Sequence, residues 1–89
     1  MPARSIEIVN QLGLHARAAA KLVQVANRFE SEILIRKDGK EANAKSIMAV
    51  MMLAAARGSA IEVSACGPDE QPALQALAEL IENRFGEDK

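Results

Sequence analysis

The chain has 89 residues, which is enough for one small domain over residues 1–89. Its net charge is −1 and its only aromatic residues are two Phe, so it has neither the basic surface nor the stacking side chains of a nucleic-acid-binding protein. With one cysteine and one histidine, the chain can form neither an internal disulfide nor a zinc site made of these residues. It has no apolar leader and no apolar run near the roughly 20 residues that span a membrane. We therefore predict a cytoplasmic protein without cofactor, metal or membrane insertion.

Residues 5–9 alternate between polar and apolar side chains, which predicts a first strand. Ile6 and Ile8 would face the core, and Ser5 and Glu7 the solvent. In the loop at 10–13, Gly13 either forms a simple turn or permits a close approach of the backbone, and both roles remain open.

His15 is the chain's only histidine, and it lies between this strand and a helical run at 16–29, in the position of a helix N-cap. The first backbone amides of that helix, at Ala16, Arg17 and Ala18, have no partners within it, and the helix dipole adds about half a positive charge. A phosphate fits such a site, and the Arg17 guanidinium supplies further donors. The dipole also favours the neutral imidazole, which is a nucleophile. From these residues alone, a structural histidine remains the alternative.

One stripe of this helix is apolar and is predicted to pack on a sheet: Ala19, Leu22, Val23, Ala26 and Phe29. The small residues Ala16 and Ala20 lie near His15 on another face. They either leave the site open to a partner or simply reflect helix propensity.

Residues 33–35 predict a second strand, and Asp38-Gly39 predicts a tight hairpin into a third strand at 40–43. The third strand is short and polar. We therefore expect it at the edge of the sheet.

Ser46 precedes the apolar run 47–53, which predicts a helix with Ser46 as its N-cap. Val50 and Leu53 are sufficient for contact with the core, and exposed Met-rich surfaces suit partner docking. The exposed residues would then be Ile47, Met48 and Met51. The pattern is equally compatible with a short helix buried on all sides. Gly58 is predicted to end this helix.

Residues 60–66 alternate again and predict a fourth strand, with Cys66 on its non-core side or at its end. Asp69 is expected to cap the last helix, with Pro72 in its first turn and Gly86 at its end. The inward stripe comprises Leu74, Leu77, Ala78, Ile81 and Phe85. The order β-α-β-β-α-β-α predicts an α+β fold, in which three helices cover one face of a four-stranded antiparallel sheet.

The string Gly-Leu-His-Ala-Arg-Ala-Ala at 13–19, followed about thirty residues later by Ala-Lys-Ser-Ile-Met-Ala-Val at 44–50, resembles the HPr family of bacterial phosphocarriers in the phosphoenolpyruvate-dependent phosphotransferase system. Position 18 is usually Pro in that family and is Ala here. The resemblance implies the same open-faced β-sandwich. It also implies that His15 accepts a phosphoryl group from phosphorylated enzyme I and passes it to IIA-type proteins, with Arg17 stabilising the phosphate.

The same resemblance implies partner docking at Ala20, Ile47, Met48 and Met51, and regulatory phosphorylation of Ser46 by an HPr kinase/phosphorylase. We expect a monomer that is not an enzyme in its own right. The alternative is a regulatory paralogue of the nitrogen-related branch, which signals by its phosphorylation state. Ala18 and the Arg-Phe-Gly ending at 84–86 leave that alternative open.

Overall fold

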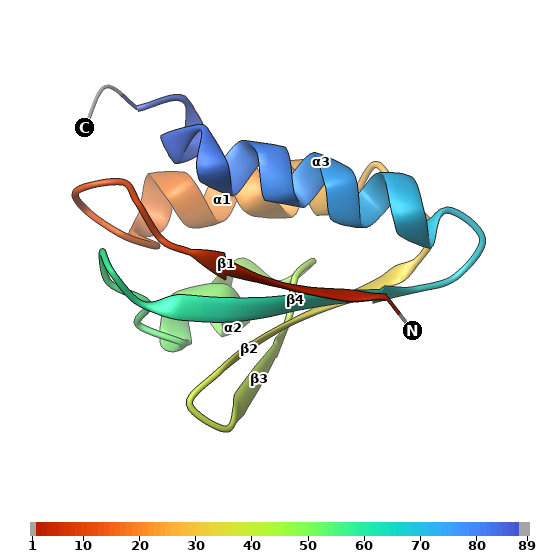
Figure 1. Ribbon diagram of the computed structural model, residues 1–89, viewed down its shortest axis with the longest axis horizontal. Helices are drawn as coiled ribbons and strands as arrows, with labels where there is room; N and C mark the ends of the chain where they lie inside the picture. Colours follow the sequence, from red (N-terminus) through yellow and green to blue (C-terminus); the bar gives the residue numbers. More distant parts are fainter. Residues whose placement is uncertain (1, 88–89) are drawn as a thin grey trace.

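The computed structural model describes residues 2–87, which form four strands and three helices in the predicted order (Figure 1). The elements are β1 (Ala3–Glu7), α1 (Ala16–Ala26), β2 (Glu32–Lys37), β3 (Lys40–Asn43), α2 (Ile47–Met52), β4 (Ala60–Cys66), α3 (Glu70–Glu82) and a short 3-10 turn, η1 (Arg84–Gly86). The predicted α+β fold class is therefore confirmed. Within residues 2–87, none of the helices combines the length and the apolar character needed to cross a membrane.

The strands form one antiparallel sheet in the order β1-β4-β2-β3. β4 lies in the middle, where Val63 is opposite Ile35 of β2, and β3 lies at one edge as expected. Asp38 and Gly39 join β2 to β3 with φ angles of 50° and 80°. This pair of left-handed residues matches the twist of the two strands and makes the hairpin tight.

The core lies between the sheet and two helices, α1 and α3, which run side by side over the same face (Figure 1). The predicted inward side chains of both helices are buried, apart from Phe29, which follows the end of α1 and is only partly buried against the core. The short α2 packs against α1 and β3. Phe85 is fully buried and anchors the segment after α3.

Three helix ends differ from the predictions. α3 ends at Glu82 rather than at Gly86, which belongs to η1. α1 ends at Ala26 rather than at Phe29. α2 ends at Met52, well before Gly58, and Leu53 is its C-cap. The residue in the left-handed conformation that follows this cap is Ala54 (φ 53°). Gly58 instead donates its backbone amide to the carbonyl of Ile8 at 2.8 Å, in the turn that leads to β4.

Asp69 stands at the N-cap position of α3, but its carboxylate makes no capping hydrogen bond. It accepts hydrogen bonds from the backbone amides of Glu30 and Ser31, at 3.0 and 2.9 Å, and from the Ser31 hydroxyl. The Ser31 hydroxyl and these amides lower the pKa of Asp69 below its ordinary value. Asp69, which was expected to cap α3, therefore connects the start of this helix to the loop before β2.

Candidate functional site

His15 caps the N-terminus of α1 as predicted: its backbone is extended (φ −75°, ψ 179°) and its carbonyl accepts a hydrogen bond from Ala19 at 2.8 Å. Gly13 serves both of its possible roles, because its φ is +66° and an added Cβ would lie 2.5 Å from the carbonyl oxygen of Ala55. The amide of Leu14 donates to that same oxygen at 2.9 Å. These contacts hold the loop from which His15 projects.

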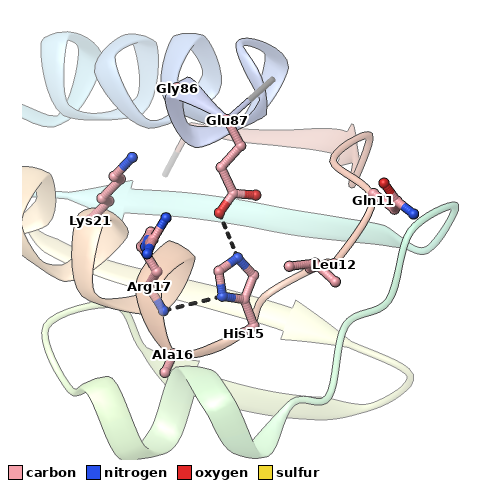
Figure 2. A pocket seen from close by; sticks show the side chains of 8 residues that line it. All are labelled: Gln11, Leu12, His15, Ala16, Arg17, Lys21, Gly86 and Glu87. Atoms are coloured by element: carbon pink, nitrogen blue, oxygen red, sulfur yellow. Dashed lines mark hydrogen bonds and ion pairs between the residues drawn. The ribbon is translucent and has the colours of Figure 1, made fainter. Parts of the chain in front are cut away.

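The Nδ1 atom of His15 accepts a hydrogen bond from the backbone amide of Arg17 at 3.3 Å (Figure 2). The ring of His15, which precedes α1, thus engages one of the three amides that were expected to have no partner within the helix. At 3.3 Å the bond is longer than an ordinary N–H···N or N–H···O bond and is weak. The amide can therefore be released to another acceptor at little cost.

The other ring nitrogen, Nε2, lies 2.6 Å from Oε2 of Glu87 (Figure 2). A carboxylate only accepts hydrogen bonds, so Nε2 carries the hydrogen and donates it. Nδ1 accepts from the Arg17 amide and therefore carries none. The hydrogen-bond network thus selects the neutral tautomer with its lone pair on Nδ1.

Glu87 is 72 residues away from His15 in the sequence, and a buried asparagine holds it in place. The side-chain amide of Asn10 donates to Oε1 of Glu87 at 3.0 Å and to the carbonyl of Gly13 at 2.8 Å. The last described residues lie beside the beginning of α1 (Figure 1), where the Lys21 ammonium donates to the carbonyl of Phe85 at 2.7 Å. The C-terminal segment is therefore part of the site.

Burial raises the pKa of the Glu87 carboxyl, but the hydrogen bonds donated by Asn10 and His15 and the nearby positive charge of Lys21 outweigh this effect. The pKa of Glu87 consequently lies below its ordinary value. The carboxylate is therefore ionised at neutral pH.

An open hollow of about 820 Å³ lies over this N-terminus (Figure 2). Its lining is Gln11, Leu12, His15, Ala16, Arg17, Lys21, Gly86 and Glu87. Arg17 and Lys21 bring positive charge to the hollow from α1, beside the helix N-terminus, so that an anion such as phosphate is favoured there. No group of three or more metal-ligating side chains is found within residues 2–87.

The remaining predicted positions of α1 differ in exposure. Ala16 is exposed, Ala20 is half-buried, and the side chain of Ala18 is fully buried in the core. Ala18 therefore contributes only its backbone to the site, whereas Ala16 leaves the hollow accessible from outside.

The helix α2 presents an apolar surface next to α1, which we call the α2 surface. It consists of four exposed side chains: Ile47, Met48, Met51 and Met52. Met48 is 70% exposed, while Val50 is fully buried, so the alternative of a helix buried on all sides is wrong. Ser46 caps α2 as predicted, with its hydroxyl accepting from the Ala49 amide at 3.3 Å.

Sequence reasoning missed several residues of this region. Met52 and Leu12 are as exposed as Met48, although neither was expected to be. Asn10 and Glu87 had no recognisable signal, because a single polar residue in a loop and one acidic residue in a charged tail fit no periodic pattern. Only the apolar stripe that ends in Phe85 indicated that the tail begins close to the core.

Comparisons with known proteins match nearly the whole chain. The family model described as PTS HPr component phosphorylation site covers residues 2–83. The phosphocarrier protein HPr of Cupriavidus necator is 55% identical over 84 residues, which cover 94% of this chain and 94% of that protein. The crystal structure of HPr-C-His from Thermoanaerobacter tengcongensis has a TM-score of 0.96 and 49% sequence identity, with 100% of both chains covered. An HPr dimer from the same organism has a TM-score of 0.79 and 50% identity, covering 98% of this chain and 100% of that one.

Proposed function

This chain belongs to the HPr family, the phosphocarriers of the phosphotransferase system, and we propose that Nδ1 of His15 accepts a phosphoryl group from phosphorylated enzyme I and passes it to IIA-type proteins. The observation that carries the proposal is the hydrogen-bonded ring of His15. Its lone pair is on Nδ1, at a helix N-terminus that favours an anion.

In the proposed step, the Nδ1 lone pair attacks the phosphorus and the bond between phosphorus and the donor's nitrogen breaks, with its electron pair returning to the donor. The phosphoryl oxygens then replace Nδ1 as the acceptor for the Arg17 amide, and they also accept hydrogen bonds from the backbone amides of Ala16 and Ala18. The Arg17 guanidinium stabilises the charge on these oxygens, and no metal is needed for this. Transfer to the recipient is the same displacement in the opposite direction.

The open hollow supports a carrier role rather than an enzyme's, because it leaves His15 accessible to a large partner. We propose that both partners dock on Ala20 and on the α2 surface. Methionine side chains are flexible and polarisable, so one surface of this kind can adapt to two differently shaped partners. We propose that the carrier is cytoplasmic and that it acts as a monomer, because a single chain supplies every residue named for the site.

We also propose that the Ser46 hydroxyl is the target of an HPr kinase/phosphorylase. The hydroxyl is half-buried at the start of α2, where its hydrogen bond to Ala49 is long and easily given up. A phosphate at a helix N-terminus is electrostatically tolerated, so the fold would be kept while charge is added beside the α2 surface.

Incubation with phosphoenolpyruvate, Mg²⁺ and enzyme I tests the carrier function. One acid-labile phosphoryl group is expected on His15 by mass spectrometry, and none on His15→Ala. Arg17→Ala should keep its fold and accept the group more slowly, since an exposed donor is lost without opening the core. A modification at another residue, or a competent His15→Ala protein, contradicts the proposal. Parallel reactions with the enzyme I of the nitrogen-related branch test the regulatory alternative.

A further inference from the structure

We infer that Glu87 is a positioning residue for the phosphoryl transfer: it keeps the lone pair of His15 on Nδ1 and stabilises the positive charge that the ring acquires on phosphorylation. The inference rests on the proposed function of His15. Glu87 lies beyond residues 2–83, which the family model covers, so the family match assigns it no role. The role is argued from the contacts of this chain alone.

The first step concerns the tautomer. Neutral imidazole carries its hydrogen on either nitrogen, and only the form with a free Nδ1 can attack from the helix N-terminus. The carboxylate of Glu87, 2.6 Å from Nε2, holds the hydrogen on the side away from the incoming phosphoryl group. The weak bond from Arg17 to Nδ1 fixes the orientation of the ring from the opposite side.

The second step concerns charge. When Nδ1 forms a bond to phosphorus while Nε2 keeps its hydrogen, the ring becomes cationic. The charged groups around it in the hollow are Arg17 and Lys21 on α1 and Glu87 after η1, and α2 contains no charged residue. Glu87 is therefore the one negative side chain among the described residues that line the hollow, and it compensates the helix dipole and the two cations. The cationic ring is also the better donor, because it leaves as a neutral imidazole in the onward transfer.

The third step concerns the precision of the placement. Glu87 is not carried by a free tail, because Phe85 is fully buried and its carbonyl is bound by Lys21. Asn10 is fully buried as well, and its Oδ1 atom has no partner within the described residues. A buried asparagine with an unpaired oxygen is unfavourable, so the two hydrogen bonds from its amide, to Gly13 and Glu87, account for its presence.

This geometry makes Glu87→Gln a stringent test. Both carboxylate oxygens of Glu87 accept a hydrogen bond, one from Asn10 and one from His15. Glutamine has only one acceptor oxygen, so its NH₂ group must face either the Asn10 amide or the Nε2–H of His15. The substitution removes the charge and mismatches one hydrogen bond without changing the size of the side chain. Glu82→Gln is the matched control, because Glu82 is exposed on α3 and lies outside the hollow.

The experiment combines ¹⁵N NMR of the His15 ring, a pH titration of the phosphorylated protein and the rate of phosphorylation by enzyme I. In Glu87→Gln the share of Nδ1 without hydrogen should fall, the titration midpoint of the phosphorylated ring should shift to lower pH, and the rate should fall about tenfold. Glu87→Ala should change all three in the same direction, Glu87→Asp should restore the titration midpoint in part, and Glu82→Gln should match the wild type.

Wild-type ring signals and rates in both Glu87→Gln and Glu87→Ala would overturn the inference. So would a slower reaction with unchanged ring signals and midpoint, since that points to docking rather than to the imidazole. The circular dichroism spectrum shows whether each variant is folded, and Glu87→Ala decides the matter if Glu87→Gln is not. A wild-type protein that is never phosphorylated on His15 would refute the proposed function instead.

Discussion

Gly13→Ala is expected to destabilise the protein and to displace His15, because two separate costs meet at this residue. Its φ of +66° is a left-handed conformation, and the new Cβ would lie 2.5 Å from the Ala55 carbonyl oxygen and 2.9 Å from Cα of Ala56. Both neighbours are backbone atoms, so neither can move aside as a flexible side chain would. The Ala55 carbonyl also accepts the hydrogen bond from Leu14, the residue before His15.

The magnitude follows from three terms. The left-handed conformation costs a residue with a Cβ about 1–2 kcal/mol. The unfolded chain of the alanine variant is less flexible, which returns about 0.4–1 kcal/mol. Inserting a methyl group against packed backbone adds about 1–3 kcal/mol. The free energy of unfolding should therefore fall by about 1–5 kcal/mol.

Gly39→Ala is the matched control for the steric term. Gly39 has a similar φ of +80°, but an added Cβ would meet no atom within 4 Å. Only the conformational terms remain there, so the expected loss is about 1 kcal/mol. Urea denaturation measures both variants, and phosphorylation by enzyme I should slow only in Gly13→Ala. Equal losses of stability in the two variants would refute the close approach at Gly13.

Three further predictions concern the surface and the loops. Met48→Glu should weaken binding to enzyme I in a titration and change the free energy of unfolding by no more than about 0.5 kcal/mol, because the side chain is 70% exposed; a large fall in melting temperature would contradict this. Ser46→Asp should slow phosphorylation of His15 at least about tenfold, because it places a negative charge beside the α2 surface. Ser46→Ala should lose only about 0.5 kcal/mol of stability in urea denaturation, through the lost cap. A wild-type rate for Ser46→Asp would mean that Ser46 acts only as a helix cap. The pKa of Asp69 is lower in the folded state than in the unfolded chain. The ionised Asp69 carboxylate therefore contributes its full stabilisation of the fold above the unfolded pKa of about 3.9, and this contribution is lost as the pH falls through the lower folded pKa. Denaturation curves of Asp69→Asn between pH 6 and pH 2 should therefore depend less on pH than those of the wild type, and identical pH dependence would count against the link to Ser31.

The prediction for α2 shows where a pattern stops being informative. A run of six apolar residues on a short helix fits a buried helix and an exposed docking surface equally well, because periodicity reports only relative orientation. The packing of α2 against α1 and β3 buries Val50 and leaves Met48 in solvent. The exposure of this helix was therefore decided by its neighbours in space.

Features that depend on neighbours along the chain could be predicted from the amino-acid sequence alone. The alternation in β1 and β4, the Asp38-Gly39 hairpin, the caps at His15 and Ser46 and the inward stripe of α3 all rest on hydrogen bonds or side-chain spacing within a few residues. Local propensities and periodicities encode such features directly. The family motif around His15 could be recognised for the same reason.

Features that join residues far apart in the chain emerge only when the chain is folded. The place of β4 between β1 and β2, the link from Asp69 to Ser31 and the contact of Glu87 with His15 join segments whose separation no local pattern records. The same holds for Asn10, whose loop position is unremarkable until its amide reaches Glu87. The identity of the reactive histidine was thus present in the sequence, whereas the tautomer of its ring depends on a carboxylate that only the folded chain brings within hydrogen-bonding distance.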